Sequence, residues 1–293
     1  MLASFIMSVA NRSPKARGRF FKWTFETLAA MTPGVESWTF MNYGYAELDP
    51  RAEPLRLDAR DEPERYCIQL YHHAASPVDL RDEDVLEVSC GRGGGASYVK
   101  RYLNAKSVTG IDFSANQIAF CRRVHKVPGV RFLQGTAEDL PLPGDGFDAV
   151  INIEASCLYR DTARFFSEVF RVLRPGGHFV YADIHRAGDI DQVFAELSQS
   201  GLVVESHQDI TENVTEALRL DHRRRAAGLK RNAPFFLRGL LGTFAGTQGT
   251  RIPNGLAGGS LVYLSFVLSK PGRRRDVTVE ARRVERECVS PLA

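Results

Sequence analysis

Short apolar strands alternate with helical segments between residues 84 and 183, and this alternation limits the fold more than any other feature of the sequence. A chain that passes repeatedly from strand to helix to strand lays its strands parallel in one sheet, with helices on both faces. The predicted strands are Val85–Val88, Ser107–Ile111, Val130–Leu133, Phe147–Ile153, His178–Asp183 and Leu261–Leu268. The sequence therefore predicts an α/β fold with a doubly wound, mostly parallel sheet.

The predicted helices between these strands have recognisable ends. Ser114 is expected to cap a helix over Ala115–Val124, because its hydroxyl can accept a hydrogen bond from a free N–H of the first turn. An amphipathic helix over Thr162–Leu173 is expected to end at Pro175-Gly176-Gly177. Further helical structure is predicted over Ala96–Leu103 and through most of residues 186–245.

Composition divides the chain into three parts. Residues 1–75 are predicted to form an N-terminal helical segment that serves as a lid, and residues 76–270 the main domain, with residues 186–245 as its substrate region. Residues 271–293 are rich in arginine and lack a core pattern, so a disordered basic tail is predicted. Within the first part, Gly18–Met31 has the spacing of a helix with an aromatic side, which either packs on the main domain or lies at a membrane interface.

The net charge of +3 is concentrated at the two ends of the chain. Residues 1–25 hold five basic residues and no acid, and residues 271–293 hold six arginines against four acids, which leaves residues 26–270 with a net charge of −4. A nucleic-acid enzyme more often carries a basic face on the domain itself. No nucleic-acid partner is therefore expected, whereas the basic ends suit peripheral contact with anionic lipid at the inner face of the membrane.

The cysteines and the N-terminus favour a cytoplasmic protein. The five cysteines are odd in number and widely spaced, which indicates neither a disulfide framework nor a zinc site and fits a reducing compartment. The apolar residues 1–9 precede their positive charges, which is the reverse of a secretory signal. No run of the sequence approaches the roughly 18 apolar residues that a membrane-spanning helix needs.

The end of the first strand carries the candidate ligand site, because ligands of open α/β sheets bind at the carboxyl ends of the strands. A glycine-rich turn, Gly91-Arg92-Gly93, allows the backbone to lie directly against a ligand. Asp112 follows 21 residues after Gly91, where a carboxylate accepts hydrogen bonds from ribose hydroxyls. The spacing differs from the G-x-G-x-x-G of a dinucleotide site, and Glu87 suits an ammonium group better than a pyrophosphate. The pattern indicates a nucleoside cofactor with an amino-acid part, as in S-adenosylmethionine.

Five motifs occur in order between roughly residues 80 and 185. They are Glu87-x-Ser89-x-Gly91-x-Gly93, Asp112, Gln134–Pro141, Phe147–Val150 and Glu168–Gly177. This series resembles the class I S-adenosylmethionine-dependent methyltransferases, and the resemblance implies a seven-stranded Rossmann-like sheet with S-adenosylmethionine as the cofactor. Ser89 stands where that family usually has its first glycine, and Thr136 where it often has aspartate.

A closer similarity covers almost the entire chain. It rests on Phe40–Tyr45, Leu70–His72, Leu86–Gly91, Gly93–Tyr98, Glu154–Ser156 and Gly246–Gly249. These segments are similar to the mycobacterial phthiotriol and phenolphthiotriol dimycocerosate methyltransferases, which methylate a hydroxyl on a very long-chain lipid, and the Ser89-Cys90 variant is shared with them. Cys157 stands where that group often has a histidine. The resemblance implies an O-methyltransferase whose acceptor is a lipid or a lipid-like hydrophobic molecule.

The residues expected to contact the cofactor lie at strand ends and in the lid. The family resemblance implies that Ala137 and Glu138 lie beside the adenine, and that the Asn42–Tyr45 segment folds over the cofactor, with an ordinary turn as the alternative. The full set is Tyr45, Glu87, Ser89, Gly91, Gly93, Asp112, Phe113, Gln117, Thr136, Ala137, Glu138 and Asn152.

Methyl transfer to a hydroxyl benefits from a base that takes up the proton. His185 is the first expectation for this base, because imidazole titrates near neutral pH and the residue follows a strand end. Glu154 and His72 are the other two candidates, and a capping role for His185 or a structural role for His72 stays open. No metal site is predicted, because no His/Asp cluster has the spacing of metal ligands.

The acceptor region is less constrained by the sequence. The apolar run Phe235–Phe244 either lines an acyl-chain pocket or packs as ordinary helix core, and Arg223–Arg225 is expected to be a solvated face or a contact with anionic lipid. Besides hydroxyl methylation of a lipid, the alternatives are methylation of another small hydrophobic metabolite or of a fatty-acid carboxylate. A cofactor-binding protein without catalytic activity is a third reading.

Overall fold

A computed structural model describes residue 26, residues 38–232, residue 246 and residues 250–272 of the 293-residue chain. Its centre is a seven-stranded sheet with the strand order β3-β2-β1-β4-β5-β7-β6. The strands are β1 (Asp84–Val88), β2 (Ser107–Asp112), β3 (Val130–Gln134), β4 (Phe147–Ile153), β5 (Leu173–Arg186), β6 (Val203–Asp209) and β7 (Leu261–Ser269). Pairing is parallel from β3 to β5, and β7 lies antiparallel to both β5 and β6. The predicted doubly wound, mostly parallel sheet is confirmed.

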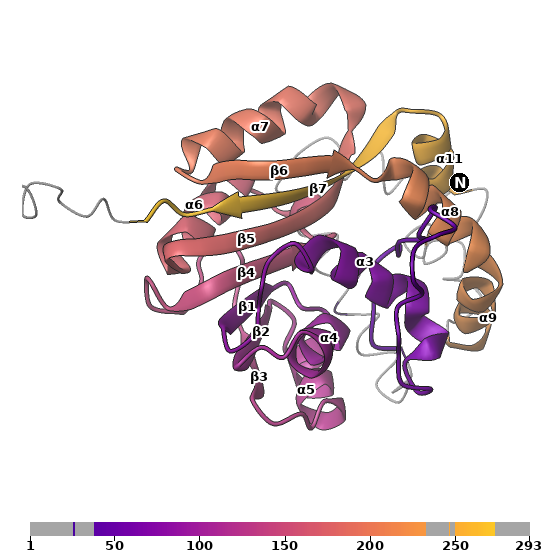
Figure 1. The fold of residues 1–293 in the computed structure, drawn as a ribbon, viewed down its shortest axis with the longest axis horizontal. Coiled ribbons are helices and arrows are strands. Elements are labelled where there is room, and N and C mark those ends of the chain that lie inside the picture. The colour runs from indigo at the N-terminus through magenta and orange to yellow at the C-terminus, as the bar shows by residue number, and fades with distance from the viewer. Residues whose placement is uncertain (1–25, 27–37, 233–245, 247–249, 273–293) are drawn as a thin grey trace, which may run out of the picture.

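Helices cover both faces of this sheet (Figure 1). They are α3 (Arg65–Ala75), α4 (Gly94–Tyr102), α5 (Ala115–Val124), α6 (Thr162–Val172), α7 (Ile190–Gln199), α8 (Thr211–Leu220), α9 (His222–Asn232) and α11 (Arg251–Ala257), with short 3₁₀ turns at Glu62–Glu64, Ser156–Leu158 and Ala187–Asp189. The predicted cap of α5 is confirmed, because the Ser114 hydroxyl accepts a hydrogen bond from the Gln117 N–H at 3.2 Å.

Alternating side chains of the strands belong to two separate hydrophobic cores. Val85, Ala149 and Val180 pack against α3, α4 and α5 on one face, which we call the α3 face. Their neighbours in the chain, among them Leu86 and Phe179, pack against α6 and α7 on the other face, which we call the α6 face. Successive side chains of a strand point to opposite faces, so buried parallel strands need apolar residues at both alternating positions.

The structure corrects the sequence prediction at the start of β5. The helix ends at Val172, and the strand begins at once with Leu173, so that Pro175-Gly176-Gly177 lies inside the strand rather than before it. The register to β4 jumps from the Phe147–Leu173 pair to the Ala149–His178 pair, and Gly176 takes a φ of 86° in the segment that is skipped. A bulge of this kind places proline where its missing N–H costs no ladder hydrogen bond.

A second correction concerns residues 186–245, which the sequence predicted to be mainly helical. The last residue of β5 and the whole of β6 fall in this range, in addition to α7, α8 and α9. Strand β6 lies at the edge of the sheet, and most of its side chains are exposed. Its sequence therefore lacks the apolar run by which the other strands are recognised. The predicted helix Gly18–Met31, apart from Glu26, the apolar run Phe235–Phe244 and the tail from residue 273 lie outside the described residues.

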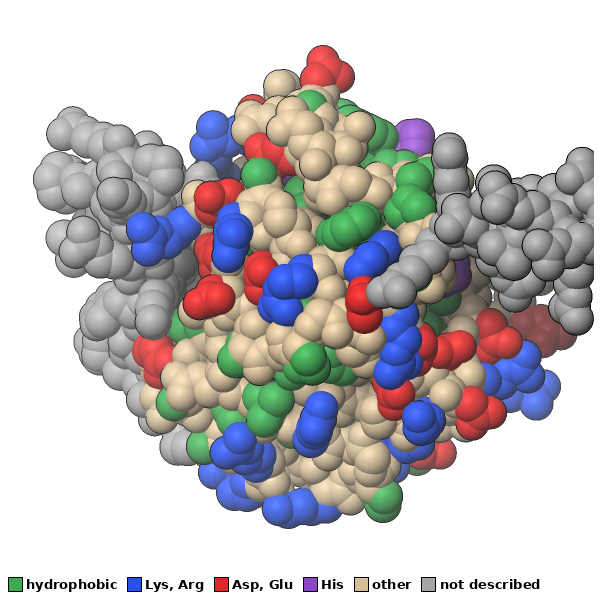
Figure 2. Space-filling view, turned by 90° about the vertical axis from the view of Figure 1, so that its left-hand side faces the viewer, with side chains coloured by type: hydrophobic (Ala, Val, Ile, Leu, Met, Phe, Trp, Pro, Cys, Tyr) green, Lys and Arg blue, Asp and Glu red, His purple; other side chains and the backbone are tan. Residues whose placement is uncertain are grey.

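The two ends of the sheet differ in what surrounds them. At the carboxyl ends of the parallel strands, α8, α9 and α11 gather beside the chain that enters α3 (Figure 1). At the amino ends, acidic and basic side chains are interspersed over the visible surface (Figure 2). Ion pairs such as Arg174–Asp148 and Lys270–Asp145 lie there. The helices that enclose a site are therefore found at the carboxyl ends, where ligands of such sheets bind.

Candidate active site

Two neighbouring strands end in left-handed backbone at this edge of the sheet. Ser89, directly after β1, has a φ of 58°, and Glu154, directly after β4, has a φ of 52°. Side chains other than glycine rarely adopt this conformation, which costs of order 1–3 kcal/mol and is typical of functional sites. At Ser89 the strain explains why a glycine suits the same position, and the hydroxyl is held by the Tyr159 phenol at 2.6 Å.

The glycine turn leaves its backbone uncovered on one side. Gly91 and Gly93 have positive φ values of 52° and 77°. A methyl group on Gly93 would lie 2.9 Å from side chains of α5 and β3, whereas one on Gly91 would meet only Met41 Sδ, at 3.4 Å. The turn is therefore tightly packed at Gly93 and loosely packed at Gly91, where Met41 is the neighbour, and such loose packing lets a ligand approach the backbone.

Asp112, the last residue of β2, is buried with its carboxylate directed at this turn. It accepts hydrogen bonds from the backbone N–H groups of Gly91 and Ser114, both at 2.9 Å. Burial nevertheless raises the pKa of Asp112 to about 6. Each carboxylate oxygen can accept a second hydrogen bond, so the group keeps acceptor capacity for a hydroxyl.

Glu87 is buried between β1, α3 and α4. Its Oε1 accepts a hydrogen bond from the Tyr71 hydroxyl at 2.6 Å, and a methyl group on Gly95 would come within 2.2 Å of this oxygen. Burial raises the pKa of Glu87 to about 7, against the lowering effect of the Tyr71 hydroxyl and the Ala96 N–H. Such a carboxyl is ready to ionise when a cation binds beside it.

Three buried oxygens of the predicted cofactor residues have no hydrogen-bond partner among the described residues. They are Glu87 Oε2, Gln117 Oε1 and Asn152 Oδ1. The Asn152 side chain donates through Nδ2 to the Val88 carbonyl and to the Tyr159 hydroxyl, so that only its Oδ1 remains without a hydrogen bond. Buried acceptors without donors are costly, which indicates a ligand that carries N–H and O–H groups.

The loop after β3 is fastened to the neighbouring helix. Thr136 and Asp139 form an isolated bridge, Ala137 is buried, and the Glu138 carboxylate accepts the Arg160 N–H at 3.0 Å. Phe113 meets the same region through its carbonyl, which accepts from Gln134 Nε2 at 3.1 Å. These contacts bring Phe113, Thr136, Ala137 and Glu138 to the edge of the sheet beside Asp112.

Residues 38–46, which we call the strap, cross the glycine turn. The Thr39 carbonyl accepts the Gly94 N–H at 3.1 Å, and Met41 contacts both Gly91 and Gln117. Tyr45, in contrast, stacks on His73 of α3 at 4.3 Å. The strap thus covers the turn with Met41, while Tyr45 lies against α3 rather than over the turn. Sequence reasoning missed Met41, because an isolated methionine carries no pattern.

Glu154 lies at the centre of the polar groups on the α3 face. Its Oε1 accepts hydrogen bonds from the Tyr43 N–H at 2.7 Å and from the Tyr263 hydroxyl at 2.9 Å. The residue as a whole is only partly buried by surface area, yet desolvation of the carboxyl by the surrounding protein raises its pKa to about 8. Glu154 is therefore a carboxyl held by two hydrogen bonds, with a pKa suited to proton transfer near neutral pH.

The other two candidate bases lie elsewhere. His185 alternates along β5 with Ile184, which packs with Tyr263 in the core of the α3 face, so that His185 points to the α6 face. It lies 3.3 Å from the Tyr181 hydroxyl, and burial lowers its pKa. His72 is 2.8 Å from the Tyr98 hydroxyl, between α3 and α4. His185 and His72 thus have hydrogen-bond partners, Tyr181 and Tyr98, that differ from those of Glu154.

The sequence of this chain matches known proteins over most of its length. Residues 86–181 match the family model described as a methyltransferase domain. A phthiotriol/phenolphthiotriol dimycocerosates methyltransferase of Mycobacterium leprae is 39% identical over 268 residues, which are 91% of this chain and 97% of that relative. The chain belongs to this methyltransferase family. It is an S-adenosylmethionine-dependent methyltransferase, as the motifs between residues 80 and 185 led us to expect.

Two further comparisons bear on the methyltransferase. A fatty-acid O-methyltransferase of Mycolicibacterium smegmatis is 43% identical over 199 residues, 68% of this chain and 72% of that relative. A cyclopropane synthase from Mycobacterium tuberculosis has the same fold, with a TM-score of 0.65 at 15% identity over 84% of this chain and 98% of the other. The second likeness shows the fold alone.

Two kinds of feature are not found among the described residues of the methyltransferase. None of their helices is long and apolar enough to cross a membrane. In the same part of the chain, no group of three or more His, Cys, Asp or Glu side chains is arranged to hold a metal ion.

Proposed function

We propose that this methyltransferase transfers a methyl group to a hydroxyl of a lipid or lipid-like hydrophobic acceptor, with Glu154 as the proton acceptor. The single observation that carries the proposal is the Glu154 carboxyl at the end of β4, which accepts hydrogen bonds from the Tyr43 N–H and the Tyr263 hydroxyl and whose pKa burial raises to about 8. A hydroxyl must lose its proton as it attacks, and a base whose pKa lies near the working pH is the most effective one.

The cofactor residues fit S-adenosylmethionine. The unpartnered Glu87 Oε2 suits the ammonium group, Asp112 suits the ribose hydroxyls, and the loop of Ala137 and Glu138 suits the adenine. When bound, the cofactor supplies a methyl group on a sulfonium, which is transferred by in-line displacement. The protein then has to align the acceptor and remove its proton, and alignment supplies most of the acceleration.

Two acceptor chemistries occur among the relatives by their names. One acts on phthiotriol and phenolphthiotriol dimycocerosates, and the other on fatty acids. A carboxylate acceptor is already ionised and needs no base, and it would be repelled by Glu154 once that group has lost its proton. Glu154 therefore favours the hydroxyl acceptor, while the 43% identity to the fatty-acid enzyme keeps the carboxylate as a second candidate.

The test offers both acceptors to the same enzyme. Purified protein is incubated with S-adenosylmethionine and either a long-chain secondary alcohol or the fatty acid of equal length, and methylated products are measured by mass spectrometry. We expect methyl ether from the alcohol, and a loss of about 10²- to 10⁴-fold in kcat/KM for Glu154→Gln. Methyl ester as the sole product would replace the hydroxyl acceptor by the carboxylate, and absence of both products would favour a binding protein.

The same assay ranks the candidate bases. Glu154→Gln, His185→Ala and His72→Ala are compared at saturating cofactor, with cofactor affinity measured separately. We expect His185→Ala and His72→Ala to keep most of the activity, because their side chains pair with Tyr181 and Tyr98 rather than with Glu154. A large loss in His185→Ala with a near-normal Glu154→Gln would make His185 the base.

We also propose a cytoplasmic enzyme that reaches its acceptor at a membrane surface through its basic ends. Residues 1–25 and 271–293 each carry a net positive charge, whereas residues 26–270 are net negative, and a lipid acceptor is concentrated at a membrane surface. Sedimentation with anionic and with neutral vesicles tests this. Equal sedimentation with both would remove the electrostatic contact.

A further inference from the structure

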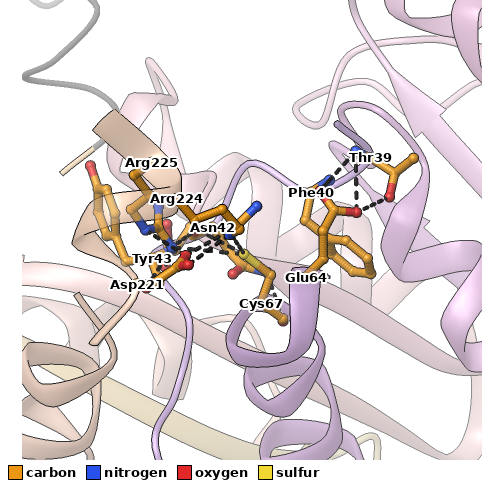
Figure 3. A network of polar contacts seen from close by, with 10 residues as sticks. Thr39, Phe40, Asn42, Tyr43, Glu64, Cys67, Asp221, Arg224 and Arg225 are labelled. Atoms are coloured by element: carbon orange, nitrogen blue, oxygen red, sulfur yellow. Dashed lines mark hydrogen bonds and ion pairs between the residues drawn. The ribbon is translucent and has the colours of Figure 1, made fainter. Parts of the chain in front are cut away.

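Helix α9 directs two arginines at the strap. Sequence reasoning expected Arg223–Arg225 to be a solvated face, and this is correct only for Arg223, which is exposed. Arg224 and Arg225 both pair with Asp221, whose side chain is 5% exposed, and the Arg225 side chain is itself only 9% exposed. Arg224 binds the carboxylate with two hydrogen bonds of 2.6 Å, and Arg225 Nε lies 3.0 Å from Asp221 Oδ2 (Figure 3).

The Arg225 guanidinium also holds two carbonyls of the strap. Its Nη2 donates to the Asn42 oxygen at 3.0 Å and to the Tyr43 oxygen at 2.9 Å. A planar guanidinium can bind a carboxylate with one edge and carbonyl oxygens with another, which the point charge of lysine cannot reproduce. Arg225 thereby ties the strap to the buried Asp221.

One peptide unit connects this contact to the active site. The Asn42 carbonyl and the Tyr43 N–H belong to the same planar peptide, in which a trans C=O and N–H point in opposite directions. Arg225 binds the carbonyl, and Glu154 Oε1 accepts the N–H at 2.7 Å. A rotation of this peptide that released Arg225 would also turn the N–H away from the carboxylate.

We propose that Arg225 is a positioning residue for the proton acceptor: through the Asn42–Tyr43 peptide it aims the Tyr43 N–H at Glu154, and Asp221 holds its guanidinium in place. The inference rests on the proposed role of Glu154. It assigns a function to α9, which lies outside residues 86–181 of the methyltransferase domain.

The strap has independent anchors on both sides of this peptide. Glu64 accepts the Thr39 N–H at 3.1 Å and the Thr39 hydroxyl at 2.5 Å, and the Tyr66 carbonyl accepts the Tyr45 N–H at 2.9 Å. The Ala46 N–H donates to the Asn213 carbonyl at 3.1 Å. The Asn42 carbonyl keeps one weak donor, the Cys67 thiol at 3.6 Å. Loss of Arg225 should therefore loosen the orientation of one peptide while the strap stays in place.

Several ionisable groups interact with the charge of Glu154 and enter its titration. They are Tyr43 of the strap, Tyr71 of α3, Asp183 of β5, Arg225 of α9 and Tyr263 of β7. Arg225 is the one cation in this set of five. Removal of Arg225 should raise the pKa of Glu154. The carboxylate then loses both a positive charge and an aligned N–H donor, so that its protonated form becomes more favourable.

The test measures the proton affinity of Glu154 without an acceptor. The unfolding free energy of the protein and of Glu154→Gln is compared from about pH 5 to about pH 10.5, first with Arg225 present and then in Arg225→Met. For each background, the difference in unfolding free energy between the protein with Glu154 and the Glu154→Gln variant rises with pH. The pH at which this difference levels off reports the pKa of Glu154 in the folded protein. We expect Arg225→Met to move this pH upward by about one unit, since a hydrogen bond to a charged group is worth about a tenfold change or more.

Arg223→Met, on the same helix but exposed, is the matched control and should leave the titration of Glu154 unchanged. Arg225→Lys serves as the second variant where Arg225→Met does not fold, and it should give a smaller upward movement. An unchanged titration in a folded Arg225 variant overturns the inference. In turnover, the loss at pH 7 should be about tenfold and should be recovered at high pH, whereas an equal loss at every pH would indicate a purely structural role.

These outcomes separate the inference from the proposed function. A moved titration together with normal turnover of Glu154→Gln would refute Glu154 as the base and leave the coupling through the peptide intact. An unchanged titration together with an inactive Glu154→Gln would refute the coupling through the peptide and leave Glu154 as the base.

Discussion

Replacing Glu154 by glutamine should stabilise the protein while it removes activity. Glutamine has the shape of the protonated carboxyl, and its amide oxygen can accept both hydrogen bonds that Glu154 Oε1 receives, from the Tyr43 N–H and the Tyr263 hydroxyl. The substitution therefore removes a titrating group and keeps its contacts. A catalytic carboxyl held at a raised pKa costs stability, which is a common price of function.

The magnitude follows from the two pKa values. An exposed glutamate ionises near pH 4.5, whereas Glu154 in the folded protein ionises near pH 8. Between these values the folded state binds one proton more than the unfolded state, so the free energy of unfolding falls as the pH rises. This reduction in the free energy of unfolding is negligible well below pH 4.5, reaches about 3 kcal/mol at pH 7 and levels off above pH 8. Because the Glu154 residue is only partly buried by surface area, solvent screening reduces this figure, and we expect Glu154→Gln to gain about 1–3 kcal/mol at pH 7.

Urea unfolding followed by circular dichroism at pH 5, 7 and 9 measures this gain. The difference between the variant and the parent should be below about 1 kcal/mol at pH 5 and largest at pH 9. Glu212→Gln, at an exposed position in the first turn of α8, is the control and should show little dependence on pH. A variant less stable than the parent at pH 9, or a difference independent of pH, would falsify the raised pKa of Glu154.

Three further predictions concern the cofactor side of the site. Asp112→Asn should weaken S-adenosylmethionine binding by about 10- to 100-fold, because one charged acceptor is lost; unchanged affinity by calorimetry would contradict its ribose role. Between pH 6 and pH 7.5 the affinity of the parent should rise as Glu87 ionises, since its pKa is about 7, and Glu87→Gln should remove that rise; an equal rise in the variant would exclude Glu87 as its source. Gly95→Ala should lower the unfolding free energy by about 1–3 kcal/mol, because its methyl group would come within 2.2 Å of Glu87 Oε1 and Tyr71. Gly228→Ala, on α9 with open space around it, should instead be neutral or stabilising, and equal losses in both would indicate a helix effect rather than a clash.

The order of strands and helices could be predicted from the sequence because it depends on local patterns. The buried strands β1, β2 and β4 are apolar over most of their length, and the Ser114 cap lies one residue before its helix. Edge strand β6 was missed because its exposed residues read as loop or helix, and the Pro175-Gly176-Gly177 bulge because proline and glycine commonly end an element. The glycine turn and Asp112 were also found locally, since parallel strands bring their carboxyl ends to one edge.

The placement of the candidate proton acceptor was decided by the tertiary structure alone. Glu154 receives its hydrogen bonds from Tyr43, 111 residues earlier, and from Tyr263, 109 residues later, and Arg225 holds a strap 182 residues away. No local period records such contacts, and the alternation of β5 sends His185 to the opposite face. The sequence by itself determined the fold family, the candidate cofactor edge and the short set of candidate bases, because these follow from neighbouring residues. Which base the site surrounds, and which arginine reaches it, depended on how distant segments pack, because burial and charge at Glu154 exist only once those segments meet.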